Sequence, residues 1–194
     1  MYMTTKTIFA SCAKAAFALA AVVMMSAAFT SCSKDNDNND GRTTPLPEPK
    51  AQTMTIDGIE KPITKATYED RGTDKCWLRL FPSNDEDEVL KLELSITRHI
   101  TGKLIDLTQR EKPVNDTELY WSVRYFVNGH NTTLLGSWGN PDASSPLFTT
   151  GTLTVSNPTG NSFTIVLRNG RVIGINDGKE HTITVSYSGP ITKE

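Results

Sequence analysis

Apolar and polar residues alternate with a period of two along most of the chain beyond Ala51. Leu90, Leu92 and Leu94, for example, alternate with Lys91 and Glu93. Successive side chains of a strand point to opposite faces, so this pattern indicates strands that bury one face and expose the other. Helical periodicity sustained over about ten residues is found nowhere in this region. We therefore predict an all-β domain over residues 52–194.

Turn signals divide this region into short strands. Asn128-Gly129 and Asn169-Gly170 predict two-residue hairpin turns, because both central positions of a type I′ turn need positive φ. The predicted strands are 52–56, 61–69, 75–82, 88–98, 103–107, 118–128, 131–136, 148–156, 162–168, 171–175 and 180–188. About 8 to 11 short strands favour a single antiparallel β-sandwich, with a closed lipocalin- or calycin-like barrel as the alternative.

One strand carries a bulky residue at its centre. Trp121 lies on the same predicted face as Val123 and Tyr125, so we expect it in the core. Its neighbour Ser122 lies on the opposite face, where we expect contact with solvent. This pair therefore tests whether the sheet has one buried face and one wet face.

The N-terminal region has the order of a secretory signal. Lys6 and Lys14 precede an apolar run from Ala15 to Phe29, and no acidic residue interrupts it. As a helix rising ~1.5 Å per residue, this run would reach only ~22 Å, short of the ~30 Å hydrocarbon core of a bilayer. We therefore predict that residues 1–31 form a signal peptide that is removed.

The cleavage site lies in Phe29-Thr30-Ser31-Cys32, which resembles the lipobox of bacterial lipoproteins. The resemblance implies cleavage between Ser31 and Cys32 and attachment of acyl chains to Cys32. Two or three acyl chains, at ~0.8 kcal/mol for each buried CH₂, hold a protein on a membrane without further contacts. The mature chain is therefore expected to be anchored by lipid in the cell envelope.

Residues 32–51 are predicted to form a disordered tether, since a polar run is followed by a proline-rich stretch. Asp35, Asp37 and Asp40 follow the lipidated cysteine closely. This acidic run resembles the export signal of surface-exposed lipoproteins in Bacteroidetes, which implies an outer-membrane protein displayed on the cell surface. The alternative is a linker that only keeps the segment soluble.

The segment from Gly151 to Gly189 resembles the C-terminal hairpins of small Bacteroidetes lipoproteins with sandwich or lipocalin-like β-domains. The repeated elements are Gly151-Thr152-Leu153-Thr154-Val155, Ser162-Phe163-Thr164-Ile165 and Ile183-Thr184-Val185-Ser186-Tyr187. The resemblance implies a fold and a cell-surface setting. It transfers no functional residue.

Charge and cysteine content narrow the function classes. Removal of the signal peptide takes away two lysines and no acidic residue, so the net charge changes from −2 to −4. An acidic chain without a cluster of basic residues argues against nucleic acid as a partner. With Cys32 acylated and Cys12 removed, Cys76 has no partner for an internal disulfide, and its strand-like context favours a buried packing role.

No catalytic motif accompanies this pattern. The chain lacks the nucleophile elbow G-x-S-x-G and the glycine-rich motifs of nucleotide-binding proteins. His99, His130 and His181 are spaced unlike any short metal-binding motif. We therefore expect neither an enzyme nor a bound metal or cofactor.

A loop tryptophan offers the one candidate for ligand binding. Trp138 lies in a segment rich in glycine, proline and asparagine, where an indole either plugs the end of the core or is exposed for recognition. If exposed, it would provide a stacking face beside Asn140 and Asp142, as a carbohydrate site requires. The first hypothesis is therefore a binding module for a glycan or a cell-surface protein.

Another possibility is a carrier that encloses a small apolar ligand within a closed barrel. The cavity would be lined by Trp121, Tyr125, Phe163 and Tyr187. A filled core would exclude this hypothesis.

Overall fold

The computed structural model describes residues 44–112, 119–157 and 160–194. The predicted signal peptide, Cys32 and the acidic residues Asp35, Asp37 and Asp40 lie outside these ranges. Within them, no helix combines the length and the apolar character needed to cross a bilayer.

The described chain is built almost wholly of strands, with one short helix. The elements are β1 (Thr53–Ile56), β2 (Ile59–Pro62), β3 (Lys65–Asp70), β4 (Lys75–Phe81), β5 (Val89–Ser95), α1 (Ile96–His99), β6 (Leu104–Asp106), β7 (Ser122–Val127), β8 (Thr132–Trp138), β9 (Phe148–Ser156), β10 (Ser162–Ile173), β11 (Glu180–Pro190) and β12 (Thr192–Lys193). The all-β prediction is therefore confirmed.

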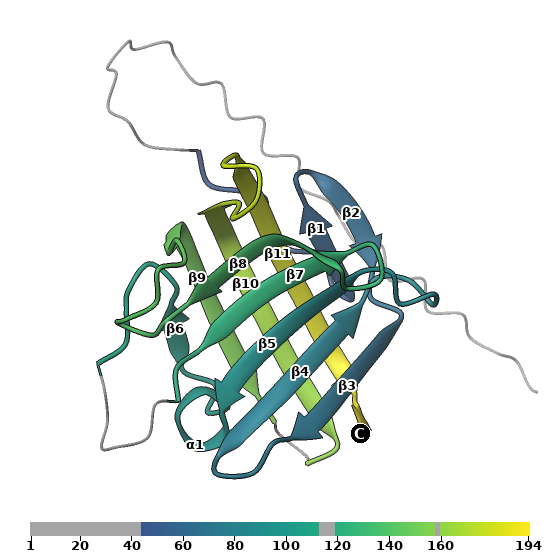
Figure 1. Ribbon diagram of the computed structural model, residues 1–194. Helices are drawn as coiled ribbons and strands as arrows, with labels where there is room; N and C mark the ends of the chain where they lie inside the picture. Colours follow the sequence, from purple (N-terminus) through teal and green to yellow (C-terminus); the bar gives the residue numbers. More distant parts are fainter. Residues whose placement is uncertain (1–43, 113–118, 158–159) are drawn as a thin grey trace, which may run out of the picture. The chain divides into compact units, whose positions relative to one another are not determined.

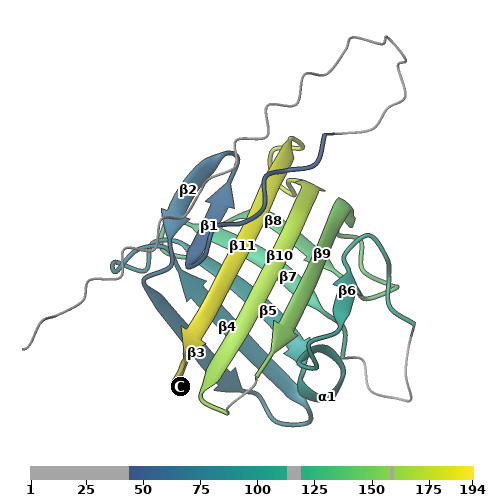
Figure 2. The same cartoon turned by 180° about the vertical axis from the view of Figure 1, so that it is seen from behind.

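These strands form two sheets of six, packed face to face. The first sheet has the order β2-β1-β11-β10-β9-β6 and the second the order β12-β3-β4-β5-β7-β8. Figure 1 shows the second sheet in front, with its strands crossing those of the first sheet, and Figure 2 shows the first sheet from the other side. Among the described strands no ladder joins the two sheets, so the fold is a sandwich and the alternative of a closed barrel is wrong.

The core lies between the sheets and follows the predicted alternation. Leu90, Leu92 and Leu94 are buried, whereas Lys91 and Glu93 remain partly exposed on the outer face. All members of the core cluster lie between Met54 and Tyr187, and residues 42–194 form one compact unit. Every described strand and every residue of the core cluster therefore lies within this segment.

Trp121 and Cys76 occupy the core, as predicted. The side chain of Trp121 is 0% exposed. Cys76 is a free, buried thiol, and its pKa is raised to about 12, mainly by burial and secondarily by Asp70 and Asp74. A thiol in this state is not a nucleophile at neutral pH, so Cys76 has a packing role.

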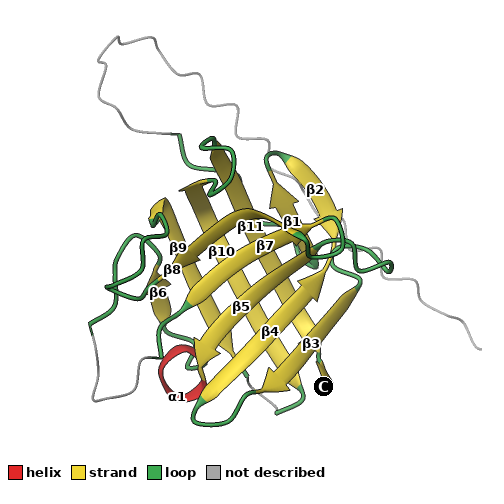
Figure 3. Ribbon diagram, viewed as in Figure 1, coloured by secondary structure: helices red, strands yellow, loops and turns green. Residues whose placement is uncertain are grey.

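Two predicted strands are divided in the structure. The strand expected over 88–98 ends at Ser95, because the Ser95 hydroxyl accepts a hydrogen bond from the backbone N–H of Arg98 and caps α1, the helix drawn in red in Figure 3. The strand expected over 61–69 is split between β2 of the first sheet and β3 of the second.

The prediction of a hairpin turn at Asn169-Gly170 is wrong. β10 runs through these residues, and its register with both neighbours shifts there, which marks a β-bulge. Asn169 has φ of 49°, and a Cβ on Gly170 would lie 2.7 Å from Leu167 and 2.8 Å from the carbonyl oxygen of Ile183. The positive φ and the close packing of a bulge produce the same Asn-Gly signal as a turn.

The prediction of a turn at Asn128-Gly129 is confirmed, although the connection is longer than expected. β7 ends at Val127 and β8 begins at Thr132, so the loop covers residues 128–131. Asn128 and Gly129 have φ of 56° and 62°, and His130 follows with φ of 68°. A second shift in register lies between Tyr125 and Phe126.

Candidate functional site

Strand register places Trp138 opposite Ser122 on the outer face of the second sheet. Ser122 pairs with Trp138 across β7 and β8, and with Glu93 across β7 and β5. Directly paired residues of antiparallel strands share a face, so these three side chains form a row with Trp77, which pairs with Glu93. We call this the Trp77–Trp138 row.

Trp138 is half-buried and borders two hollows. The smaller, about 120 Å³, lies on the sheet side, and its polar walls include Lys75, Glu93, Ser122 and Asn140. The larger, about 470 Å³, lies between Ser144, Ser145, Pro146 and the apolar residues Ile173 and Ile175. We call Trp138 with these two hollows the Trp138 site.

Each hollow is lined by a buried serine whose hydroxyl has no hydrogen-bond partner in the described part of the chain. Ser122 is 1% exposed and lines the smaller hollow, and Ser145 is 7% exposed and lines the larger one. The prediction that Ser122 faces solvent is therefore wrong, because Trp138 and its surroundings cover this outer position. Buried hydroxyls are normally paired, so these two are unusual, and a ligand reaches either oxygen only when the side chains that cover it move.

Glu93, which lines the smaller hollow, is the shared ion-pair partner of three basic side chains. The Glu93 carboxylate accepts contacts from Lys91 at 3.1 Å, from Lys75 at 3.5 Å and from Arg124. The guanidinium of Arg124 lies 5.4 Å from the Trp138 ring and 5.5 Å from the Phe126 ring. The indole of Trp138 is thus held beside a cluster in which three cations share one carboxylate.

The loop that follows Trp138 is positioned by Arg110. Its guanidinium donates to the backbone carbonyl oxygens of Trp138 (2.5 Å), Asn140 (3.1 Å) and Ser145 (2.6 Å). Three such bonds from one side chain fix the backbone on both sides of the Trp138 site.

The structure brings two of the three predicted site residues together. Trp138 does not plug the core but remains half-buried at the end of β8, and Asn140 lines the smaller hollow. Asp142 is exposed and lines neither hollow; its backbone N–H donates to the side-chain oxygen of Asn140 at 2.8 Å. The sequence analysis missed the contributions of Ser122 and Arg110, which no local motif marks.

His99 forms a dyad with Glu111 that is structural in its geometry. The backbone N–H of Ser95 donates to His99 Nδ1 at 2.9 Å, so the proton lies on Nε2, which donates to Glu111 Oε1 at 2.9 Å. Burial, the largest single contribution, raises the pKa of Glu111, but hydrogen bonds from His99 and Trp121 N–H hold it below its usual range. Both ring nitrogens are occupied, so His99 cannot accept a proton from a substrate.

The other two histidines also have defined neighbours. His130 lies near the rings of Phe81 and Phe126. His181 lies between two carboxylates, with Nδ1 2.7 Å from Asp57 and Nε2 3.1 Å from Asp177. Within the described ranges, no group of three or more histidine, cysteine, aspartate or glutamate side chains is arranged to hold a metal ion.

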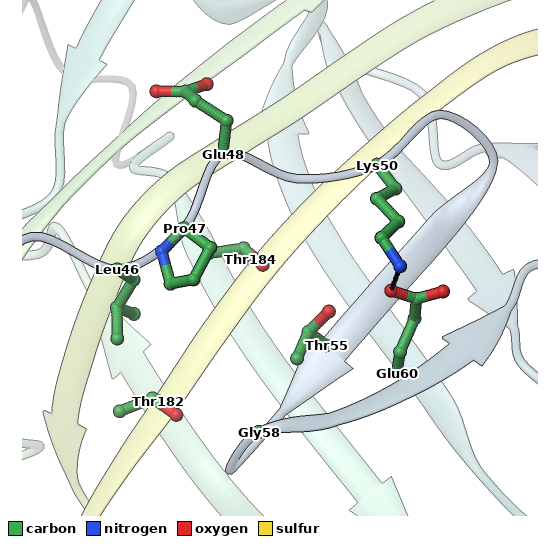
Figure 4. A pocket seen from close by; sticks show the side chains of 9 residues that line it. All are labelled: Leu46, Pro47, Glu48, Lys50, Thr55, Gly58, Glu60, Thr182 and Thr184. Atoms are coloured by element: carbon green, nitrogen blue, oxygen red, sulfur yellow. Dashed lines mark ion pairs between the residues drawn. The ribbon is translucent and has the colours of Figure 1, made fainter. Parts of the chain in front are cut away.

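A third hollow, about 280 Å³, lies where residues 44–50 cross the outer face of β1 and β11 (Figure 4). The amide N–H of Leu46 donates to Asn169 at 3.0 Å, and Arg171 donates to the carbonyl oxygen of Thr44 at 3.0 Å. This described end of the predicted tether therefore contacts the sheet. In the described part of the chain, none of the buried side-chain polar atoms without a partner belongs to a residue that lines this hollow, so it offers a ligand less than the Trp138 site does.

Comparison with known proteins adds no relative: no family model, no curated protein and no solved structure matches the chain. The functional argument therefore depends on the geometry of the Trp138 site and on the N-terminal sequence.

Proposed function

We propose that this protein is a lipid-anchored lipoprotein of the cell envelope, displayed at the cell surface, whose sandwich binds a glycan at the Trp138 site without acting as an enzyme. The observation that carries the glycan proposal is the half-buried indole of Trp138 between two hollows, each lined by a buried serine hydroxyl without a partner in the described chain.

This combination matches the chemistry of a sugar ring. One face of a sugar carries C–H groups that pack on an aromatic ring, and its edge carries hydroxyls that need both donors and acceptors. The Ser122 hydroxyl can donate and accept, and Glu93 and Lys75 add one acceptor and one donor to the same hollow. A small apolar ligand would leave the Ser122 hydroxyl without a partner.

The carrier hypothesis is not favoured by the fold. It requires an enclosed cavity lined by Trp121, Tyr125, Phe163 and Tyr187, but these side chains all belong to the packed core cluster. The two sheets also form a sandwich in the described chain, not the closed barrel on which that hypothesis was based.

Binding of residues 42–194 to an array of glycans tests the proposal. The Trp138→Ala variant should lose about tenfold or more in affinity for any glycan that the wild type binds, because the stacking face is removed. Phe126→Ala is the matched control: Phe126 lies on the same outer face and equally close to Arg124, but outside both hollows.

The control variant should bind within about threefold of the wild type. If the wild type binds no glycan, or if Trp138→Ala binds as well as Phe126→Ala, the proposed site is wrong.

The anchor has a separate test. Replacement of Cys32 by Ala should abolish incorporation of labelled palmitate and move the protein from the membrane fraction to the soluble fraction, because the acyl chains are its proposed attachment. Cys76→Ala is the control, since this buried thiol is not an acylation site. If the Cys32 variant still sediments with membranes, the lipoprotein proposal fails.

A further inference from the structure

The outer face of the second sheet carries a row of cations beside the Trp77–Trp138 row. Arg79 pairs with Lys91 across β4 and β5, and Lys91 pairs with Arg124 across β5 and β7. Each of these residues lies two positions along its strand from a member of the Trp77–Trp138 row, so the two rows share a face and lie ~7 Å apart. We call Arg79, Lys91 and Arg124 the cationic row.

The carboxylates on this face do not balance its cations. Lys75 and Arg71 add two positive charges to the cationic row. The facing acidic groups are Glu69, which pairs with Arg71 and Arg79, Glu93, which is shared by Lys75, Lys91 and Arg124, and Glu194, which pairs with Arg79. Five cations thus face three carboxylates, so the face is positive whether or not Lys91 is protonated, although the chain as a whole has a net charge of −2.

The Lys91 amine lies within this group of cations. It is 3.2 Å from the centroid of the Trp77 ring. Burial, followed by the charges of Arg124, Arg79 and Lys75, lowers the pKa of Lys91 to about 7. The neighbouring cations thus disfavour the charge on Lys91, and an anion bound nearby would relieve this repulsion.

We propose that the glycan bound at the Trp138 site is acidic, with one ring packed on Trp138 and its carboxylate or sulfate groups beside Lys75 and the cationic row. This inference rests on the proposed function and names its ligand class. Single-stranded nucleic acid also combines anionic groups with stacking rings, but a protein displayed on the cell surface meets acidic polysaccharides first.

A pair of ligands that differ in charge and not in ring shape provides the test. Hexagalacturonate carries a carboxylate on each ring, and its methyl ester is neutral. Residues 42–194 should bind the acid about tenfold more tightly than the ester at low salt, and the preference should shrink as added salt screens the charges. A sulfated hexasaccharide from heparin distinguishes sulfate from carboxylate, and a single-stranded oligonucleotide of equal charge tests nucleic acid.

Two variants locate the effect. Lys75→Met keeps the length of the side chain and removes the charge that lines the smaller hollow, so the affinity for the acid should fall severalfold further than the affinity for the ester. Lys193→Met, on the edge strand β12 at the opposite side of the same sheet, should leave the preference unchanged. In addition, the pKa of the Lys91 amine, measured by NMR, should rise when the acid binds and stay near 7 with the ester.

The outcomes separate this inference from the proposed function. Equal affinities for acid and ester, both lost in Trp138→Ala, would overturn the acidic class and leave glycan binding intact. A preference that persists in Lys75→Met with an unchanged Lys91 pKa would place the anion elsewhere and overturn the inference. Tighter binding of the oligonucleotide than of any glycan, or no glycan binding at all, would overturn both the acidic ligand class and the proposed glycan-binding function.

Discussion

Gly139 should be intolerant of any side chain, because it packs against the indole of Trp121. A Cβ built on Gly139 would lie 2.5 Å from Trp121 Nε1 and 2.8 Å from Cδ1, closer than real Cβ contacts. Trp121 is 0% exposed, so the indole is packed on the sides that face the core. In addition, the N–H of Gly139 donates to the carbonyl oxygen of Trp121 at 2.8 Å, which fixes the backbone at this point.

Overpacking of this kind costs ~1 to 3 kcal/mol, so Gly139→Ala should lose a large share of the ~5 to 15 kcal/mol that a domain possesses. With a urea m-value of ~2 kcal/mol/M, a loss of ~2 kcal/mol lowers the unfolding midpoint by about 1 M. Gly139→Val should lose more, since the added volume is larger. Urea unfolding of residues 42–194, followed by far-UV circular dichroism, measures these losses.

Gly136→Ala is the matched control, since Gly136 lies in β8, three residues before Gly139. Its Cβ would lie 2.9 Å from the end of the Ile175 side chain, which is 45% exposed and can turn away. This variant should therefore stay within about 0.5 kcal/mol of the wild type. Equal losses at Gly136 and Gly139 would refute the packing argument, and so would a Val variant no less stable than the Ala variant.

Three further predictions follow from the core, the buried histidine and the N-terminal segment. Trp121→Ala should cost ~3 to 5 kcal/mol of unfolding free energy in the same urea assay. Ser122→Ala should stay within about 0.5 kcal/mol of the wild type, because the Ser122 hydroxyl bonds to no described residue, but this variant should bind glycan more weakly. Burial is the largest single influence on the pKa of His181 and lowers it, but hydrogen bonds to Asp57 and Asp177 outweigh burial, so the pKa is raised overall. Protonated His181 therefore stabilises the fold below about pH 6.5, and this contribution is lost as the pH rises through the raised pKa. The stability difference between the wild type and His181→Gln should therefore be largest near pH 6 and shrink towards pH 9, and a difference that grows with pH would contradict the assignment. Replacement of Asp35, Asp37 and Asp40 by Ala should reduce cleavage by protease added to intact cells, and unchanged cleavage would leave these residues as a plain linker.

The alternation of apolar and polar residues was sufficient to predict an all-β domain, its core and the burial of Trp121, but it could not separate a sandwich from a barrel, because the interior of either takes alternate apolar residues. The same pattern could not predict where a strand ends. The alternation continues through Ile63, where the chain passes from the first sheet to the second, and through Ser95, where α1 begins. The Asn-Gly signal was ambiguous for a related reason. It reports positive φ, which the loop at Asn128 and the bulge at Asn169 both require.

The Trp138 site shows most clearly what the sequence leaves open. A two-residue turn at Asn128-Gly129 would pair Val127 with His130 and Ser122 with Leu135. The actual loop of residues 128–131, together with the bulge between Tyr125 and Phe126, pairs Ser122 with Trp138 instead. Because a shift of one residue moves a side chain to the other face, the neighbours of Trp138 depend on details that no local pattern encodes.

The most direct test of the account is the behaviour of the three indole N–H groups when a glycan binds. Their NMR signals in residues 42–194 can be assigned with Trp→Phe variants at positions 77, 121 and 138. Titration with the glycan selected on the array should shift the Trp138 signal and leave that of Trp121 unchanged, because only the former borders the two hollows while the latter is buried in the core. A saturating glycan that leaves the Trp138 signal in place would contradict the assignment of this site.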